Sequence, residues 1–380
     1  MLNKPPLLVV TNLYPLAWEP NRATFNRQQF DLLKDEYELF ILVPVAFMDW
    51  FKNRKVISNN HRIKYVPSLY TPKVGRRFYS YQMFFSILLF AGMWIRAIKP
   101  KKILASWAYP DAVASAWLAR LYAADFYFKV HGSDINLHAG IPARGKQILK
   151  AAKSARAILS VSDALRQSLL ALGVNEQKVV TIYNGVDHDL FAGRNDNDLD
   201  SAYILFVGNL KADKGVIELL EGFARFYKST NKASNNDDST KLKLVYAGSG
   251  EMLGELKVRA KNLEIADNVL FLGSIQHAVL PKWIGNAKAL ALPSYNEGVP
   301  NVVLEAMASG TPSLATNVGG IPEILPEHCG VLIPPRSSAA VEEGLAEIFD
   351  RLWVKAKIQE YSHQFSWKKN KKNLLDMLHK

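Results

Sequence analysis

The stretch ALALPSYNEGVPNVVLEAMASGTPSLATNVGGIPEI, residues 289–324, is typical of a strand, a loop, a helix, a second strand and a second loop. The apolar run Ala289 to Leu292 predicts the first strand. A helix can begin at Pro300, because the first helical turn tolerates the fixed φ and missing N–H of proline, and Gly310 ends it. Residues Thr311 to Ala315 predict the second strand. Strands this apolar favour a parallel sheet covered by helices on both faces.

Two glutamates stand out in this apolar stretch, Glu297 before the helix and Glu305 inside it, with seven residues between them. At about 1.5 Å of rise per residue, Glu305 lies roughly 7 to 8 Å along the helix axis from Pro300. The free N–H groups of the first turn lie between the two carboxylates and favour a phosphate. A nucleotide sugar matches this layout, with its sugar hydroxyls on Glu297 and its ribose hydroxyls on Glu305. Taken alone, two such glutamates are more often ordinary surface residues.

The segment EGVPNVVLEAMASGTP and the GGIPEIL loop after it resemble the donor-site signature of family 4 of the retaining glycosyltransferases. In that family two glutamates flank seven residues, and they map onto Glu297 and Glu305. The resemblance implies the GT-B fold, an α/β arrangement of two Rossmann-like, doubly wound domains that face each other across a cleft. It also implies donor contacts from the residues between the glutamates, namely Gly298, Val299, Asn301 and Val302.

The length of the chain, 380 residues, suits two domains, and its 49% hydrophobic content is ordinary for a soluble protein. We expect an acceptor-side domain over residues 1–190 and a donor domain over residues 200–365, joined by a polar linker. The resemblance implies that a C-terminal helix at about 366–380 packs back on the first domain. The single cysteine, Cys329, excludes an intramolecular disulfide and fits a reducing cytoplasm.

The net charge of +12 lies entirely in the first half of the chain, because residues 1–190 contain 25 Lys+Arg and 13 Asp+Glu. This asymmetry favours a polyanionic partner: nucleic acid, an anionic membrane surface or a phosphate-bearing acceptor. A solvated basic face that only aids solubility is the plain alternative. We expect a cytoplasmic protein, peripheral on the inner face of the plasma membrane.

The most apolar segment of the chain is Tyr81 to Ile98, and Met83 to Ile95 is its most apolar part. A run of that length is too short to span a bilayer, so we expect a core helix. The alternative is an interfacial helix that dips into a membrane beside Lys73, Arg76 and Arg77.

A histidine follows the β-rich run in FYFKVHGSDIN, residues 126–136. Ligands bind where parallel strands end in open α/β sheets, although a lone histidine there is usually structural. The string HGSD also resembles the motif of the family at this point, whose histidine maps onto His131. We therefore expect His131 to be catalytic and Asp134 to contact phosphate or acceptor.

The sequence departs from the family pattern at two phosphate-binding places. Family members often carry adjacent glycines in the first loop, whereas this loop has none and Arg22 and Arg27 lie nearby. The lysine expected near the diphosphate matches at Lys214, but the family's arginine directly after Gly208 is replaced by Asn209. We predict that Arg22 or Arg27 supplies the missing positive charge, because arginine can grip phosphate with two parallel hydrogen bonds.

The resemblance implies glycosyl transfer with retention, from a nucleoside-diphosphate sugar to a glycan or polyprenyl-diphosphate-linked acceptor in polysaccharide assembly. It places Glu297 on the sugar hydroxyls; a nucleophilic Glu297 would have to lie beneath the anomeric carbon. No metal or cofactor is expected, since the sequence has no metal-spaced Cys/His cluster and no phosphate-binding G-x-x-x-x-G-K-[ST] loop. The alternatives are a nucleotide-sugar epimerase on the same fold and a basic nucleic-acid-binding protein, although we expect no nucleic-acid partner.

Overall fold

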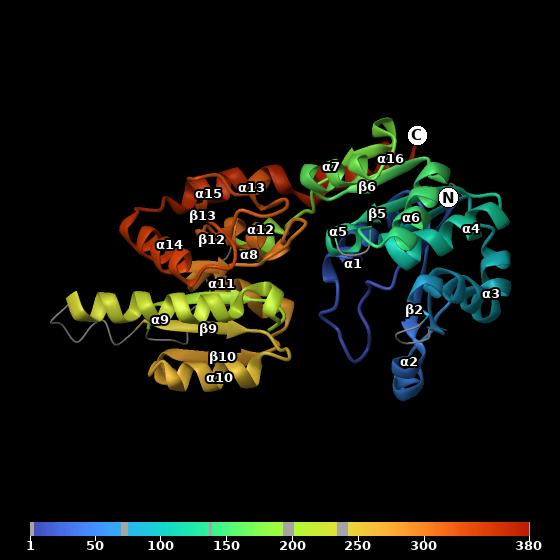
Figure 1. Ribbon diagram of the computed structural model, residues 1–380. Helices are drawn as coiled ribbons and strands as arrows, with labels where there is room; N and C mark the ends of the chain where they lie inside the picture. The colour runs from blue at the N-terminus through green and yellow to red at the C-terminus, as the bar shows by residue number, and fades with distance from the viewer. Residues whose placement is uncertain (1–3, 70–74, 137–138, 193–200, 234–241, 380) are drawn as a thin grey trace. The chain divides into compact units, whose positions relative to one another are not determined.

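The computed structural model describes residues 4–69, 75–136, 139–192, 201–233 and 242–379. The chain divides into two compact units, Met1–Asn184 with Lys368–Lys380, and Gly185–Trp367. Each unit contains one parallel sheet with helices between its strands (Figure 1). The predicted α/β class with two doubly wound sheets is confirmed. Most of the expected linker, residues 193–200, lies outside the described residues, as does Lys73.

The sheet of the first unit has seven described strands in the order β3-β2-β1-β4-β5-β6-β7. The order reverses between β1 and β4, which pair in parallel. Ligands bind at such a switch point, outside the carboxyl ends of the strands. The strands are β1 Pro6–Val10, β2 Glu38–Ala46, β3 Ile63–Ser68, β4 Lys102–Ser106, β5 Asp125–Val130, β6 Ala157–Ser160 and β7 Val179–Thr181.

Helices connect these strands and cover the sheet. They are α1 Thr24–Asp31, α2 Phe47–Asn53, α3 Tyr79–Ile98, α4 Val113–Leu121, α5 Ser133–Asn136, α6 Pro142–Ser154, α7 Asp163–Ala171 and α16 Trp367–Leu378, with short turns η1 Leu32–Asp35, η2 Arg76–Phe78, η3 Ala108–Ala112 and η4 Glu176–Lys178.

The C-terminal helix α16 belongs to the first unit from Lys368 onward. Leu374, Met377 and Leu378 are buried in the core of that unit. Gln29 on α1 donates a hydrogen bond to Asn370 Oδ1 at 2.8 Å, so the helix is also held by a buried polar contact.

The sheet of the second unit runs β10-β9-β8-β11-β12-β13, and its order reverses between β8 and β11. Its strands are β8 Tyr203–Val207, β9 Lys243–Ala247, β10 Val269–Gly273, β11 Ala289–Leu292, β12 Ser313–Thr316 and β13 Gly330–Ile333. Its helices are α8 His188–Phe191, α9 Val216–Ala233, α10 Leu253–Asn262, α11 Leu280–Asn286, α12 Asn301–Ala308, α13 Ile321–Ile324, α14 Ser338–Asp350 and α15 Lys355–Ser362, with turns η5 Ala212–Lys214, η7 Ala266–Asn268, η8 His277–Val279 and η9 His363–Phe365.

The elements predicted around the two glutamates are present. β11 has the predicted bounds, and α12 begins at Asn301 with Pro300 as its N-cap. Gly310 follows the helix with φ 70°, a left-handed conformation that glycine adopts at little cost. β12 begins two residues later than predicted, at Ser313, because Pro312 has no N–H to donate to a neighbouring strand.

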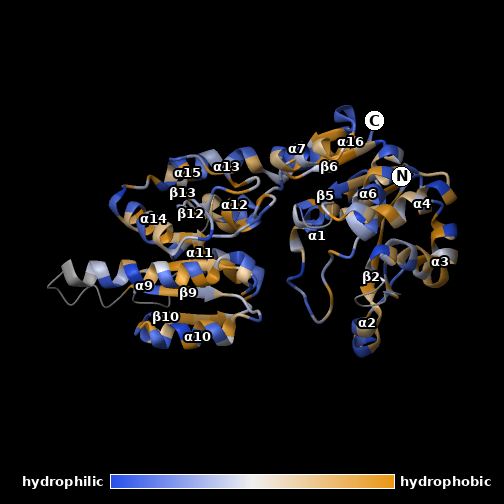
Figure 2. Cartoon of the chain, viewed as in Figure 1, coloured by the Kyte–Doolittle hydropathy of each residue, from blue (hydrophilic) through white to orange (hydrophobic). Residues whose placement is uncertain are grey.

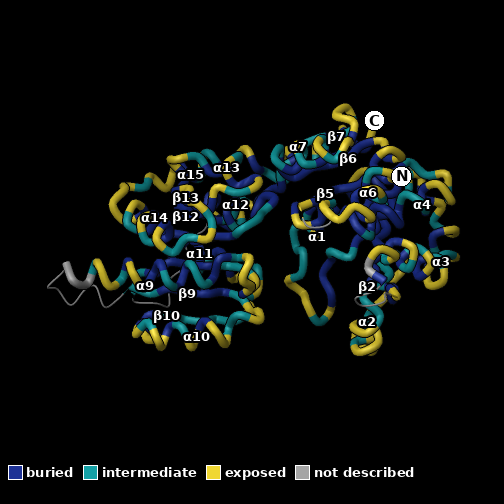
Figure 3. Tube along the Cα trace, viewed as in Figure 1, coloured by how far each residue is buried: buried dark blue, intermediate teal, exposed yellow. Residues whose placement is uncertain are grey.

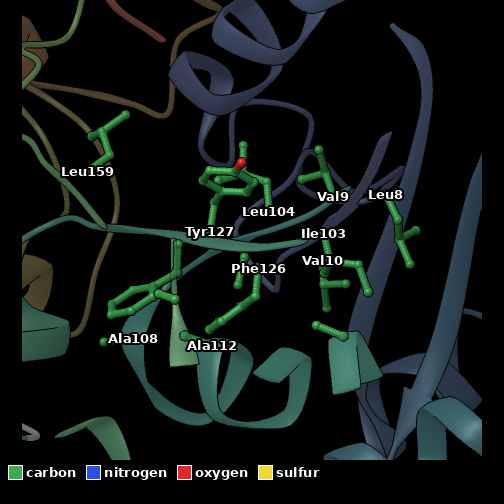
Figure 4. Close-up of a cluster of buried hydrophobic side chains, with 14 of the residues drawn as sticks. Leu8, Val9, Val10, Ile103, Leu104, Ala108, Ala112, Phe126, Tyr127 and Leu159 are labelled. Carbon is green, nitrogen blue, oxygen red and sulfur yellow. The ribbon is translucent and has the colours of Figure 1, made fainter. Parts of the chain in front are cut away.

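Apolar side chains of the strands form the core of each unit. Figure 4 shows part of the first core, where β1, β4 and β5 contribute side chains that include Val9, Leu104 and Phe126. In Figure 3 most of the strands are buried, whereas β10 is of intermediate burial throughout, and the exposed residues lie mainly on helices and loops. Figure 2 shows both polar and apolar residues on the covering helices. Each fully buried leucine, valine or phenylalanine stabilises the fold by about 1.5 to 3 kcal/mol.

The apolar segment at residues 81–98 forms α3, a helix of 20 residues. Helix α3 is long and apolar enough to cross a membrane by length and composition, a test that core helices of soluble proteins also pass. The estimate that this segment is too short was therefore wrong, because the charge-free run extends from Phe78 to Ile95 and the helix continues to Ile98. Met83, Ile87 and Ile95 are buried against the core, so one side of α3 is a core face as predicted.

Candidate active site

The loops at the carboxyl edge of the second sheet pack against one another through glycines. A Cβ on Gly248, after β9, would lie 1.8 Å from the carbonyl oxygen of Gly208, after β8. A Cβ on Gly319, after β12, would lie 1.9 Å from the carbonyl oxygen of Glu297. Because no side chain fits at either position, these glycines bring the loops after β8, β9, β11 and β12 together.

Lys214 and Glu297 form an ion pair within this group of loops. Lys214 Nζ lies 2.6 Å from Glu297 Oε1, and the two side chains are 26% and 13% exposed. The following residue, Gly215, has φ 66°, and a Cβ there would lie 2.0 Å from the carbonyl oxygen of Pro293. Glycine at this position therefore seats the turn that carries Lys214 directly against the end of β11.

Glu305 pairs with a histidine that the sequence reasoning missed. His277 Nε2 lies 2.8 Å from Glu305 Oε1, and the ring of Phe191 meets the His277 ring edge-on with centroids 5.6 Å apart. The hydrogen bond to Glu305 raises the pKa of His277 above its ordinary value, although burial of the ring opposes this. The available signal was a histidine four residues after the apolar run that forms β10, a pattern that is too common to single out.

The raised pKa of His277 predicts a pH-dependent contribution to stability. A group whose pKa is raised by folding stabilises the protein at pH below its unfolded value, about 6.5, and loses this effect as the pH rises through the folded value. We expect His277→Gln to cost roughly 1.5 kcal/mol at acidic pH, where the hydrogen bond involves charged groups. Thermal melting at about pH 5.5 and about pH 8.5 measures this, with the exposed His61→Gln as control. An equal loss at both pH values would contradict the prediction.

The remaining predicted donor residues lie at the start of α12. Gly298 and Val299 are buried, whereas Asn301 and Val302 are half-buried. The N-cap Pro300 makes no side-chain capping bond to the first-turn N–H groups. Unsatisfied N–H groups at a helix start favour an anion. Glu297 and Glu305 thus flank a segment suited to a diphosphate.

Asn209, at the position where family members have an arginine, is exposed. Asn209 follows Gly208 in the loop after β8, and its carbonyl oxygen accepts a hydrogen bond from the N–H of Lys211. The neutral Asn209 side chain adds no positive charge to the loop. Lys214 is the cation that the structure places directly beside Glu297.

His131 in the first unit is a neutral, firmly held histidine. Its Nε2 lies 2.8 Å from the hydroxyl of Ser106, at the end of the neighbouring strand β4. The rings of Phe25 and Trp107 lie 5.4 Å and 6.0 Å from its ring, centroid to centroid. Burial and the positive charge of Lys129 hold the pKa of His131 well below its ordinary value. His131 is therefore uncharged near neutral pH.

Asp134 supports the loop that carries this histidine. Its Oδ1 accepts the N–H groups of His131 and Gly132 at 2.9 Å and 2.8 Å, and its Oδ2 accepts that of Ala108 at 2.9 Å. The residue is 0% exposed. The buried carboxylate therefore holds the loop after β5 in place, and a contact of Asp134 with phosphate or acceptor stays a prediction.

The first loop lies beside a cavity of about 410 Å³ at the switch point of the first sheet. Arg22 lines this cavity, pairs with Glu19 at 3.0 Å and donates to the carbonyl oxygen of Asn12 at 3.2 Å. Asn12 is in turn held by the buried Asp111 through bonds of 2.6 Å and 2.8 Å, and burial raises the pKa of Asp111 to about 8. Asp111 was also missed, because its partner lies 99 residues away in the chain.

Arg27 lies away from the loop on α1, where its side chain pairs with Asp31 at 3.8 Å and is 63% exposed. Of the two arginines proposed to replace the missing charge, only Arg22 therefore lines the cavity. The compensation of Asn209 stays a prediction. Among the residues described, no group of three or more His, Cys, Asp or Glu side chains is placed to hold a metal ion.

Comparison with known proteins identifies the chain. The model for glycosyltransferase family 4 matches residues 31–190, and the model for glycosyl transferases group 1 matches residues 189–372. A Bacillus subtilis protein named as glycosyltransferase TuaC of teichuronic acid biosynthesis is 26% identical over 392 residues, which cover 95% of this chain and 90% of the relative.

Solved structures resemble the whole fold. HepE from Anabaena, in complex with UDP-glucose, has a TM-score of 0.72 at 15% identity, covering 98% of this chain and 99% of that one. Sucrose-phosphate synthase from Thermosynechococcus elongatus has a TM-score of 0.78 at 17% identity, covering 99% and 98%. The fold is that of the GT-B glycosyltransferases. The family models then place the chain more closely: it belongs to the group 1 glycosyltransferases of family 4.

Proposed function

We propose that this glycosyltransferase moves a hexose-type sugar, with retention and without a metal, from a uridine-diphosphate sugar to a glycan or polyprenyl-diphosphate-linked acceptor in cell-surface polysaccharide assembly. The observation that carries the proposal is the position of Glu297 and Glu305 on either side of the α12 start, with Lys214 at 2.6 Å from Glu297. The complex of the similar HepE with UDP-glucose supports the donor class, and the name of the similar TuaC supports the polysaccharide role.

The donor contacts follow from charge and geometry. Negative charge accumulates on the diphosphate as the glycosidic bond to it breaks, so a fixed cation and the positive end of a helix bind the transition state more tightly than the donor. Lys214 and the first turn of α12 supply these groups. Glu305 accepts ribose hydroxyls, with His277 holding its carboxylate in place.

The ion pair supports a sugar-binding role for Glu297. The lysine ammonium lies 2.6 Å from the Glu297 carboxylate and withdraws electron density from it, which makes the carboxylate a weaker nucleophile. In our proposal Glu297 holds the sugar hydroxyls, and the acceptor attacks from the face that the diphosphate leaves. His131, which is neutral, hydrogen-bonds sugar or acceptor hydroxyls without bringing a charge of its own.

Replacement of Glu305 by alanine is expected to weaken binding of the uridine nucleotide. A hydrogen bond to a charged acceptor contributes roughly 1.5 to 3 kcal/mol, which corresponds to about 10-fold to 150-fold in affinity. Isothermal titration calorimetry with UDP measures the effect, and Glu343→Ala, an exposed glutamate on α14, is the matched control. Unchanged affinity for every nucleotide that binds the wild type would place Glu305 elsewhere than at the ribose.

The reaction itself is tested with the full chain, a panel of radiolabelled nucleotide sugars and a membrane extract that supplies acceptors. Label transferred to extractable lipid or polymer supports glycosyl transfer. Conversion of the free nucleotide sugar without an acceptor would instead indicate an epimerase, and steeply salt-dependent duplex binding would indicate a nucleic-acid-binding protein. The proposed site of action is the cytoplasmic face of the plasma membrane, because the basic first half suits an anionic surface.

A further inference from the structure

Helix α3 has an apolar side that no described residue covers. Tyr81, Phe85, Leu89 and Met93 recur at every fourth position, and they are 45%, 65%, 73% and 90% exposed. Side chains four apart lie on one side of a helix, so these residues form a continuous stripe. We call them the α3 stripe.

Every charged residue on α3 and on the neighbouring helices α4 and α6 is basic. α4 packs between α3 and α6, and these three helices contain six Lys and Arg residues and no Asp or Glu. The six are Arg96, Arg120, Arg144, Lys146, Lys150 and Lys153. Arg144 is buried with its guanidinium over the ring of Tyr109, and the other five are exposed. This surface is therefore positive without internal compensation.

A cavity of about 460 Å³ lies between these three helices. Trp117 and Tyr81 line it with their rings 4.6 Å apart, and Phe126 lines it from β5. Arg120 and Lys150 also line it, and neither side chain makes a hydrogen bond or ion pair with any residue that the structure describes. Two unpaired cations beside an aromatic wall suit a phosphate ester that is joined to an apolar group.

The cavity and the α3 stripe share one residue, Tyr81. A molecule with its phosphate at Arg120 and Lys150 therefore has its apolar part directed along a surface that is itself apolar. Helix α3 cannot cross the bilayer while Met83 and Ile87 remain packed in the core of the unit. It can lie in the plane of the membrane, with the α3 stripe facing the acyl chains.

We propose that the cavity between α3, α4 and α6 is a binding site for the phosphodiester headgroup of an anionic phospholipid. The bound lipid and the α3 stripe together hold the enzyme on the membrane. The inference rests on the membrane contact in the proposed function, but it assigns that contact to a built pocket rather than to net charge. Zwitterionic lipids fit less well, because their ammonium groups repel the unpaired cations.

Vesicle flotation with the full chain tests the site. The vesicles contain phosphatidylcholine with or without phosphatidylglycerol. We expect Arg120→Glu/Lys150→Glu to lower the fraction bound to phosphatidylglycerol vesicles at least tenfold. Arg225→Glu/Lys261→Glu, two exposed cations of the second unit, changes the net charge equally and should lower binding less than twofold. Equal losses in both double variants, or equal binding to both kinds of vesicle, would overturn the pocket.

Soluble probes separate a lipid site from a general anion site. Titration with monomeric dihexanoyl-phosphatidylglycerol should show saturable binding that is lost in Arg120→Glu/Lys150→Glu. Inorganic phosphate at the same concentration should bind at least tenfold more weakly, and equal binding would indicate an anion site instead. UDP affinity, measured on the same samples, should match that of the wild type. If the wild type does not bind UDP, the proposed function is contradicted. If it binds UDP but not the vesicles, only this inference is contradicted.

Discussion

Replacing Lys214 by alanine is expected to lower turnover about 100-fold to 1000-fold, the largest effect of any single change in the second unit. One fixed donor to developing charge is worth roughly 2.7 to 4 kcal/mol in a transition state, and each 1.36 kcal/mol is tenfold in rate. In the proposed site Lys214 would stabilise most of the developing charge, because Asn209, which is neutral, stands where family members have an arginine. Initial-rate assays with saturating donor measure the loss.

The controls for Lys214 exploit its ion pair and its neighbours. Lys211 lies three residues earlier in the same loop and is exposed, so Lys211→Ala should leave turnover within about threefold. Lys214→Ala also leaves Glu297 without its partner, and Lys214→Ala/Glu297→Gln removes that unpaired charge. Recovery of turnover in this double variant would show that Lys214 serves only to neutralise Glu297. Arg22→Ala and Arg27→Ala in the same assay show whether either arginine shares the leaving-group charge.

Replacing His131 by alanine is expected to lower turnover about 100-fold while UDP affinity stays within about twofold of the wild type. A hydrogen-bonding side chain at the reacting groups contributes typically 10²-fold to 10⁴-fold, and the UDP site that we propose is built from residues of the second unit. His131→Asn retains a polar hydrogen-bonding group and should recover part of the activity. His61→Ala, an exposed histidine of the same unit, is the control.

The pH profile gives an independent check on His131. Its pKa is held well below the ordinary value by burial and by Lys129. A depressed pKa means that the ring is neutral above about pH 6.5 and is protonated only in acid. Turnover should therefore show no inflection from His131 between about pH 7 and pH 9.

Weaker donor binding with near-normal turnover in His131→Ala would contradict a role of His131 in the chemical step.

Local sequence signals accounted for the elements and for part of the site. The strand before Glu297 and the helix that carries Glu305 were predictable because an apolar run, a proline and a glycine all lie within 36 residues. The partners of these groups were not predictable. His277 reaches Glu305 across 28 residues, and Asp111 holds the first loop from 99 residues away. Hydrogen bonds between distant loops leave no periodic pattern, so only the folded chain reveals them.

Two glycines of the second unit show the same limit of prediction from sequence. The positive φ of Gly310 is a common device at a helix end and can be read from its position. The need for Gly248 arises from the carbonyl oxygen of Gly208, 40 residues earlier, and from no local feature. Its sequence context alone therefore predicts an ordinary turn, and the close approach of two loops becomes visible only in three dimensions.

The position of α16 determines when the first unit can complete its core during synthesis. Leu374, Met377 and Leu378 fill the core of the first unit, and Lys102 Nζ donates to the carbonyl oxygen of Leu378 at 2.6 Å. During synthesis, all of Gly185–Trp367 is translated before these residues leave the ribosome. At about 5 to 20 residues per second this takes roughly 10 to 40 s. We expect the core of the first unit to remain open throughout that interval and to close only after residues 368–378 have been made.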